Sequence, residues 1–374
     1  MDIGIITLHA VLNFGSALQV YATSKVLTEM GHTVKVIDYW RPLDHLAQYL
    51  FRIVKAPEKT ITHKVLSVGY KSIELVVTRK LFKQFYRENV CLTKRYNTYE
   101  KLLADPPGVD ACISGSDQIW NSLHNFRIEK AYYLDFVPTK CKRIAYAASF
   151  GVDALPEGEV EDVARLVGGF DAISVREDTA IDILAQLGRN DVCHVLDPTM
   201  LLTKEEWGTF AESFQHKDPY LLVYTVEEKA SIVAMACAKS IAKKRNLKIY
   251  HVTAGGFRQA VPGSDKEFLF KTPRFFLGAM LNAEFIVASS FHGTAFALNF
   301  EKQFISVMPD RFSVRAKSIL RMMGVEERAV SSEEEAARIT EQDIDYSVVG
   351  QKLAAERTKS RRFLADALDG PNRR

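Results

Sequence analysis

The segment 285–298 constrains the fold most, because a short apolar run is followed by a polar turn and then by an Ala-rich apolar segment. This order predicts a buried strand, a tight turn and a helix. The turn contains Ser289, Ser290, His292 and Gly293, and a glycine lets the backbone bend sharply. The first N–H groups of the helix would point back at the turn, so we expect His292 to face an anion site. The alternative is a structural histidine that is hydrogen-bonded to the backbone.

The same order of elements occurs near the amino terminus. Residues 3–8 form an apolar run, residues 17–30 have apolar side chains at helical spacing, and residues 33–39 alternate like a strand after Gly31. Together they predict a βαβ unit in a parallel sheet. Its first loop, residues 9–16, lies where open α/β sheets bind ligands. The loop lacks the GxGxxG pattern, so it does not predict a dinucleotide site.

Length and composition limit the classes of protein that the chain can represent. A chain of 374 residues that is 47% hydrophobic can form two cores, which predicts two domains. The net charge of +3 gives no reason to expect a nucleic-acid partner. Residues 1–8 do not read as a secretory signal, and no run approaches the ~20 apolar residues that span a bilayer.

Cysteine and metal-ligand patterns point to a cytoplasmic protein without a metal centre. The five cysteines are odd in number and scattered, with no CxxC pair, so we expect reduced thiols. The sequence has no HxxxH pattern, no carboxylate cluster and no Cys/His spacing typical of a metal site. We therefore predict no metal.

Residues 41–104 interrupt the alternation of strands and helices. The segment is rich in Lys and Arg, and residues 73–86 have helical periodicity. The pattern favours an inserted pair of helices with a solvated basic face. The alternative is that this face contacts an anionic membrane or a polyanionic acceptor.

Polar residues follow a buried strand in residues 110–121. Ser116, Asp117 and Gln118 lie in the turn after the apolar residues, where side chains and N–H groups are exposed at a sheet edge. The alternative is that Ser116 or Asp117 only caps a helix. Both interpretations are compatible with each other.

Three arginines are candidates for binding an anion. Arg176 follows the strand 172–175, and Arg311 and Arg315 follow the strand 304–307, so topology brings all three towards sheet edges. A guanidinium group is a permanently charged fork suited to phosphate or carboxylate. For Arg176, the alternative is a structural ion pair with Glu177, Asp178 or Asp197.

The chain divides into three parts on this pattern. Residues 1–200 predict a first Rossmann-like α/β domain that includes the insertion at about 41–104. Residues 201–345 predict a second Rossmann-like domain, which begins with a crossing segment before a fresh strand at residue 220. Residues 346–374 begin with a charged helical pattern, and we expect this helix to pack back on the first domain.

Several of these stretches coincide in order with a known family. Residues 13–15 with 17–19, then 114–121, 174–177, 196–199 and 290–294 together resemble the polysaccharide pyruvyl transferase family. The motifs are spread over residues 3–307. The resemblance implies a fold similar to GT-B glycosyltransferases, with two Rossmann-like domains that face each other across a cleft.

The resemblance also implies a reaction. Members transfer the enolpyruvyl carbons of phosphoenolpyruvate to a sugar of a cell-surface glycan as a ketal and release phosphate, with no further cofactor. The expected partner is a glycan acceptor, including a lipid-linked oligosaccharide, and the expected location is cytoplasmic, including the inner face of the membrane. In relatives the position of Ser290 is often arginine, so we expect Arg176, Arg311 or Arg315 to hold the donor here.

The resulting hypothesis gives each candidate a role. His292 is the general acid and base, because an imidazole can both donate and accept a proton near neutral pH, and Asp117 is an alternative base. The predicted donor-binding residues are Arg176, Ser289, Ser290, Gly293, Thr294, Arg311 and Arg315. The predicted acceptor-binding residues are Asn13, Gly15, Ser16, Ser116 and Gln118.

Two other classes of function remain open from the sequence. One is a GT-B glycosyltransferase that uses a nucleotide sugar, since fold does not fix chemistry. Against it, the loop 13–16 has one glycine and no acidic residue stands at a recognisable ribose site. The other is a non-catalytic glycan-binding or assembly protein with the same fold.

Overall fold

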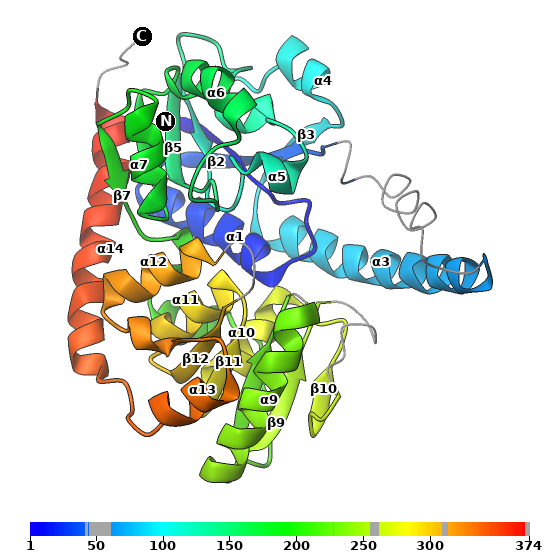
Figure 1. Ribbon diagram of the computed structural model, residues 1–374. Coiled ribbons are helices and arrows are strands. Elements are labelled where there is room, and N and C mark those ends of the chain that lie inside the picture. Colours follow the sequence, from blue (N-terminus) through cyan, green and yellow to red (C-terminus); the bar gives the residue numbers. More distant parts are fainter. Residues whose placement is uncertain (42–43, 45–60, 227, 255–261, 309–312, 371–374) are drawn as a thin grey trace.

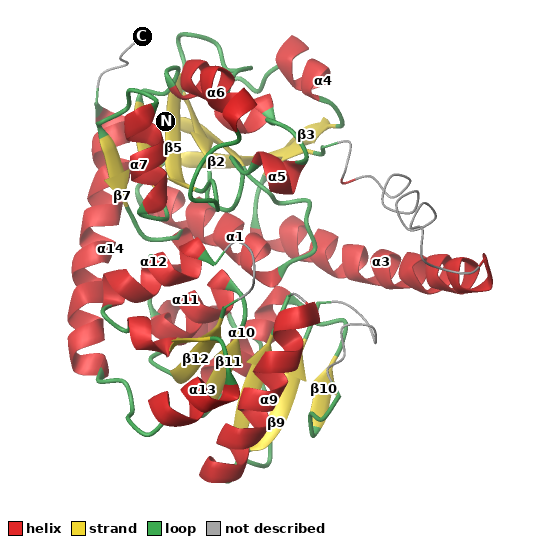
Figure 2. Ribbon diagram, viewed as in Figure 1, coloured by secondary structure: helices red, strands yellow, loops and turns green. Residues whose placement is uncertain are grey.

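The computed structural model describes residues 1–41, 44, 61–226, 228–254, 262–308 and 313–370. Two parallel β-sheets, each packed against helices, form two α/β domains that lie one above the other in Figures 1 and 2. The predicted fold class is confirmed. Among the described helices, none combines the length and the hydropathy needed to span a bilayer.

The first domain contains a seven-stranded sheet with the order β3-β2-β1-β4-β5-β6-β7. Its strands are β1 (Asp2–Ile6), β2 (Thr33–Tyr39), β3 (Leu92–Tyr96), β4 (Ala111–Ser114), β5 (Lys142–Ala148), β6 (Ala172–Val175) and β7 (Val192–His194). Its α-helices are α1 (Phe14–Glu29), α3 (Ile61–Asn89), α4 (Tyr99–Ala104), α5 (Ser122–Asn125), α6 (Val160–Val167) and α7 (Thr179–Gln186). The strand order reverses between β1 and β4, which is where open sheets bind ligands.

The second domain contains a six-stranded sheet with the order β10-β9-β8-β11-β12-β13. Its strands are β8 (Tyr220–Tyr224), β9 (Lys248–Val252), β10 (Lys266–Phe268), β11 (Phe285–Ala288), β12 (Gln303–Val307) and β13 (Ala329–Val330). Its α-helices are α9 (Glu228–Arg245), α10 (Pro273–Asn282), α11 (Phe291–Asn299), α12 (Val314–Met323) and α13 (Glu333–Ile339). This order reverses between β8 and β11, so the second sheet has a corresponding edge.

Aromatic contacts join the two domains. Phe14, at the start of α1, stacks on Phe276 of α10 with ring centroids 4.9 Å apart, and it also contacts Tyr224 at the end of β8. Tyr21 of α1 stacks at 4.0 Å on Phe210, the last residue of the linking helix α8 (Lys204–Phe210). These rings remove a large apolar area from water, so the domain interface is continuous with the core.

The C-terminal helix α14 (Tyr346–Asp369) lies along both domains, as Figure 1 shows on its left side. At its start, the hydroxyl of Tyr346 donates to the carbonyl of Ala297 in the second domain. Further along, the hydroxyl of Ser360 accepts from the backbone N–H of Leu196, and near the end Lys142 donates to the carbonyl of Leu368. The helix therefore links the second domain to the sheet of the first.

The segment 41–104 differs from the predicted insertion. Residues 61–89 form the long helix α3, which extends away from the body of the molecule, but residues 92–96 form β3, an edge strand of the first sheet. Lys94 and Arg95 of β3 are exposed, as is common in edge strands. These two charged residues interrupt the apolar alternation by which a strand is predicted from sequence. Residues 42–43 and 45–60, which also belong to the predicted insertion, lie outside the described residues.

Candidate active site

A cavity of about 290 Å³ lies between the two domains at the carboxyl ends of both sheets. The first domain contributes the loop after β1, the turn after β4 and part of α5. The second contributes the segments after β8, β11 and β12 and the start of α12. The lining residues are Leu8, Val11, Asn13, Ser16, Asp117, Gln118, His124, Val226, Ser289, Ser290, Phe291, His292, Ser306, Ser313, Arg315 and Ala316.

The second-domain wall is the amino terminus of α11. Ser290 is the N-cap, and its hydroxyl accepts from the N–H of Gly293 at 3.0 Å. His292 lies in the first turn of the helix, buried but in the cavity lining. The hydroxyl of Ser289, also in the lining, is buried without a hydrogen-bond partner in the described structure. The hydroxyl of Ser289 is therefore a polar group of this wall that no described residue satisfies.

Gly293 and Thr294, predicted to bind the donor, are not among the lining residues. A Cβ atom at Gly293 would lie 2.7 Å from the Cβ of Ala288, so only glycine lets α11 pack this closely on the sheet. The hydroxyl of Thr294 is 2.7 Å from that of Ser306 at the end of β12. Both residues hold the helix against the sheet and position His292 from behind.

The first-domain wall carries Asp117 in a fixed position. Its backbone φ angle of +86° is in the left-handed region, which residues other than glycine rarely adopt. One carboxylate oxygen accepts from the hydroxyl of Ser16 at 2.5 Å, and the other accepts from the N–H of Gln118 at 2.8 Å. Burial raises the pKa of Asp117, but Arg176 and His292 lower it more, to about 2. The group is therefore ionised at neutral pH.

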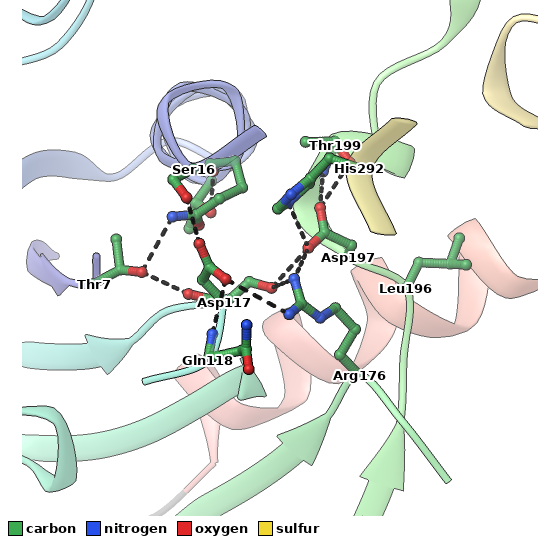
Figure 3. Close-up of polar contacts among 12 residues, drawn as sticks. Thr7, Ser16, Asp117, Gln118, Arg176, Leu196, Asp197, Thr199 and His292 are labelled. Carbon is green, nitrogen blue, oxygen red and sulfur yellow. Dashed lines mark hydrogen bonds and ion pairs between the residues drawn. The ribbon is translucent and has the colours of Figure 1, made fainter. Parts of the chain in front are cut away.

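Asp197 connects the two walls, as Figure 3 shows. Its Oδ2 atom accepts from the hydroxyl of Ser116 at 2.7 Å and from Nη1 of Arg176 at 2.8 Å, and it lies 3.6 Å from Nε2 of His292. Burial raises the pKa of Asp197, but His292 and Arg176 outweigh this and hold it well below its usual value. An ionised carboxylate thus faces Nε2 of the His292 imidazole.

Ser116, which is predicted to bind the acceptor, lies behind the cavity wall. It is fully buried, is absent from the cavity lining, and donates its hydroxyl hydrogen to Asp197. Asn13, Ser16 and Gln118 do line the cavity, as an acceptor wall requires.

Gly15, another predicted acceptor residue, is packed against the catalytic candidate. A Cβ atom at this position would lie 2.1 Å from Cγ and 2.2 Å from Nδ1 of His292. Gly15 is also absent from the cavity lining. A helix of the first domain thus contacts the imidazole of the second, and only glycine leaves room for the ring.

Arg176, the first candidate for donor binding, lies behind the cavity wall. Its guanidinium carbon is 4.2 Å from the ring centroid of Phe291, which lines the cavity, and the side chain is fully buried. It is paired with Asp197, as the structural alternative predicted, and Nη2 lies 3.8 Å from Asp117. The geometry thus gives Arg176 a positioning role for the two carboxylates.

Arg315 is the described arginine that does line the cavity. It lies on α12, and its Nε atom is buried without a hydrogen-bond partner in the described structure. Burial and the nearby charge of Arg176 lower the pKa of Arg315 to about 10, so the group is still a cation at neutral pH. Arg311, the third predicted arginine, lies outside the described residues.

Two residues of the site were missed in the sequence. His124 of α5 lines the cavity, and it follows no periodic pattern that would have singled it out. The sequence predicts Asp197 as a partner of Arg176 and as part of a family motif but gives it no role in the site, although an acid followed by proline at a strand end is a signal for a fixed polar turn. Among the described residues, no group of three or more His, Cys, Asp or Glu side chains could hold a metal ion.

Solved structures show the same architecture at low sequence identity. UDP-N-acetylglucosamine 2-epimerase from Rickettsia bellii is 14% identical, with a TM-score of 0.54 over 100% of this chain and 98% of that chain. The Methanocaldococcus jannaschii UDP-GlcNAc 2-epimerase, in complex with UDP-GlcNAc and UDP, is 12% identical, with a TM-score of 0.51 over 98% and 99%. These likenesses show a GT-B-like fold alone.

Sequence comparison is more specific. No curated protein matches the chain. A model of the family described as polysaccharide pyruvyl transferase matches residues 13–311, which include the walls of the cavity from Asn13 to Ser306. The chain therefore belongs to the polysaccharide pyruvyl transferase family.

Proposed function

We propose that the protein transfers the pyruvyl group of phosphoenolpyruvate to two hydroxyl groups of a sugar in a cell-surface glycan. The products are a cyclic ketal and inorganic phosphate. The observation that carries the proposal is the meeting of Arg315, the amino terminus of α11 and His292 at one cavity between the domains. Membership of the family supports the same reaction.

The donor carries a phosphate and a carboxylate, and the second-domain wall fits such an anion. Arg315 supplies a cation, Ser289 supplies a hydroxyl without a partner in the described structure, and the free N–H groups of α11 favour negative charge. Arg176 lies behind this wall and repels Arg315. A bound anion near both groups would offset that repulsion, so we assign the donor to this side.

The reaction begins with a proton. In the proposal, His292 as imidazolium protonates the methylene carbon of the donor, and positive charge develops on the carbon that bears the phosphate oxygen. Asp197 faces Nε2 of the ring and balances its charge. A sugar hydroxyl attacks the cationic carbon, and His292 accepts the hydroxyl proton.

The second half of the reaction forms the ring. The bond between the carbon and the phosphate oxygen breaks, phosphate leaves, and a second hydroxyl closes the ketal. The proton of one hydroxyl ends in the new methyl group, and the proton of the other ends on phosphate, so no oxidant or reductant is required. Asp117, ionised and bound to Ser16, is the alternative base for the second hydroxyl.

The first-domain wall would bind the acceptor. Asn13, Ser16 and Gln118 face the donor side with an amide, a hydroxyl and a second amide, groups that match sugar hydroxyls. The proposed acceptor is a glycan, with lipid-linked oligosaccharides included, and the proposed location is the cytoplasm or the inner face of the membrane. Neither a nucleic acid nor a metal ion takes part in this mechanism.

The test is a direct comparison of donors. Purified protein is incubated with host glycan or lipid-linked oligosaccharide and either phosphoenolpyruvate or a nucleotide sugar. We expect phosphate release and a pyruvate-sized mass increment on the glycan with phosphoenolpyruvate only. Nucleotide release and a sugar-sized increment would instead establish a glycosyltransferase. Failure of either donor to bind, measured by calorimetry, would favour a non-catalytic glycan-binding protein.

A further inference from the structure

A second cavity, of about 410 Å³, lies beside the active site and is lined by the first domain alone. It lies at the carboxyl ends of β1, β2 and β3 and against α3. The loop 8–13 separates the two cavities: His9, Ala10 and Leu12 line the second cavity, whereas Leu8, Val11 and Asn13 line the active site. One loop is thus a common wall with a different set of side chains on each side.

A carboxylate organises the inner part of this cavity. Asp38, at the end of β2, is buried, and Oδ1 lies 3.0 Å from Nε2 of His9 and accepts from Nε1 of Trp40 at 2.6 Å. Oδ2 accepts from Nε of Arg95 at 2.9 Å. Both oxygens are engaged, so Asp38 fixes its neighbours in place.

The rest of the lining combines aromatic rings with positive charge. Phe82 and Tyr86 are buried on one side of α3. The guanidinium carbon of Arg95 lies 4.4 Å from the ring centroid of Trp40. Three cationic side chains line the cavity, Arg79, Lys83 and Arg95, against the single carboxylate of Asp38. The lining therefore carries net positive charge even when His9 is neutral.

Tyr86 provides an independent sign of a missing ligand. The side chain is 6% exposed, and its hydroxyl has no hydrogen-bond partner in the described structure. A buried hydroxyl without a partner is unfavourable, and a bound polar group would supply the missing hydrogen bond. Burial and the charge of Asp117 both raise the pKa of Tyr86, so its hydroxyl stays protonated at neutral pH.

We propose that the second cavity binds a negatively charged sugar unit of the acceptor, next to the unit that is modified. This inference rests on the proposed function. Aromatic side chains match the apolar faces of a sugar ring, the hydroxyl of Tyr86 bonds a sugar hydroxyl, and Lys83 and Arg79 attract the negative group. That group is a uronic-acid carboxylate or a sugar phosphate, such as the phosphorylated end of a lipid-linked acceptor.

The test measures binding of small probes to the full chain without donor. Glucuronic acid, glucose 1-phosphate, glucose and inorganic phosphate are titrated by NMR into the wild type, Lys83→Ala and Tyr86→Phe. Lys80→Ala is the matched control, because Lys80 is an exposed lysine of the same helix that does not line the cavity. Phosphoenolpyruvate is titrated in parallel.

We expect one or both anionic sugars to bind more tightly than glucose and inorganic phosphate. Lys83→Ala should weaken the anionic sugars by ~5-fold and leave glucose unchanged, and Tyr86→Phe should weaken all the sugars by ~5-fold. Lys80→Ala should change nothing. The preference between glucuronic acid and glucose 1-phosphate identifies the negative group. Because the Tyr86 hydroxyl has no partner in the described structure, Tyr86→Phe should not lower Tm.

Two results would overturn the inference. One is equal binding of the anionic sugars to wild type, Lys83→Ala and Tyr86→Phe, and the other is binding of inorganic phosphate as tight as that of the sugar phosphate. Neither result bears on the proposed binding of phosphoenolpyruvate, because the proposed donor site lies on the other side of the loop 8–13. Conversely, sugar binding without any binding of phosphoenolpyruvate would reject the proposed function and leave the second cavity as a sugar site.

Discussion

The two cavities on either side of the loop 8–13 differ in how they are built. The active-site cavity needs both domains, and Arg176, behind its wall, is paired with Asp197 and lies 3.8 Å from Asp117. The second cavity needs the first domain only, and its cations outnumber its carboxylate. The first therefore depends on the domain interface for the positions of its reacting groups, whereas the second is complete within one domain. This difference suggests that chemistry and acceptor recognition can be separated by substitution.

The largest separation should come from His292. Replacement of the imidazole in His292→Ala should lower turnover by a factor of ~100 or more, because the proposed acid and base is lost. Binding of sugar probes to the second cavity should stay at the wild-type level. His216→Ala is the control, since His216 is an exposed histidine outside both cavities. Near-normal turnover of His292→Ala would remove this residue from the mechanism.

Arg315 should affect the donor more than the chemistry. Arg315→Gln should raise KM for phosphoenolpyruvate by ~10-fold or more while kcat changes less, because a charged hydrogen bond to the donor is lost. In Arg315→Lys, KM for phosphoenolpyruvate should lie between the values of the wild type and Arg315→Gln, since lysine keeps the charge but not the planar fork. Steady-state kinetics with varied phosphoenolpyruvate measures both constants. An unchanged KM in both variants would place the donor elsewhere.

Gly15 tests whether the domain interface positions the imidazole. In Gly15→Ala, the new methyl group would lie 2.1 Å from the His292 ring, so the ring must move, and we expect turnover to fall by ~10-fold. Gly208→Ala is the matched control, because no heavy atom lies within 4 Å of a Cβ at that helical position. Equal turnover of the two variants would show that the contact does not matter. Sugar binding in the second cavity should be unaffected by either change.

The depressed pKa of Asp117 predicts a smaller effect, on stability. Because the folded pKa of about 2 is below the ordinary value of 3.8, ionised Asp117 stabilises the fold above pH ~4, and this contribution disappears as pH falls towards 2. Its size is about 2 kcal/mol. Asp117→Asn should therefore lose less stability than the wild type between pH 5 and pH ~2. Urea unfolding at several pH values measures this, and parallel curves for the two proteins would contradict it.

The smallest expected effect is that of a chelator. The proposed mechanism neutralises the donor with Arg315 and helix N–H groups, so excess chelator should leave turnover and sugar binding unchanged. Turnover is measured before and after dialysis against the chelator. Restoration of a lost activity by a divalent cation would show that a metal takes part in donor binding.

Local patterns in the sequence predicted most of the strands of the two sheets. The strand, turn and helix expected in residues 285–298 are β11 and α11, and the first βαβ unit is β1, α1 and β2, because apolar periodicity is a local property. The edge strands β3, β10 and β13 were not predicted; in β3, Lys94 and Arg95 occupy an exposed edge.

The site could be predicted only in part, because its contacts join distant segments. Asn13, Ser16, Asp117, His292 and Arg315 were selected from strand ends, and all line the cavity. The contact between Gly15 and His292 joins two domains, and no local pattern records it. The same is true of the second cavity, where Asp38 and Tyr86 come together only after α3 has packed against the sheet.

The helix α14 has a consequence for how substrates enter. Opening the domains about the segment between β7 and α8 would strain the contacts that α14 makes there, such as Ser360 with Leu196 and Arg357 with Met200. The helix α14 therefore restrains the segment that connects the two domains. We expect the sugar and the phosphoenolpyruvate to enter the cavity between the domains without a large opening of the domains. Removal of residues 346–374 should allow a larger change of the angle between the two domains.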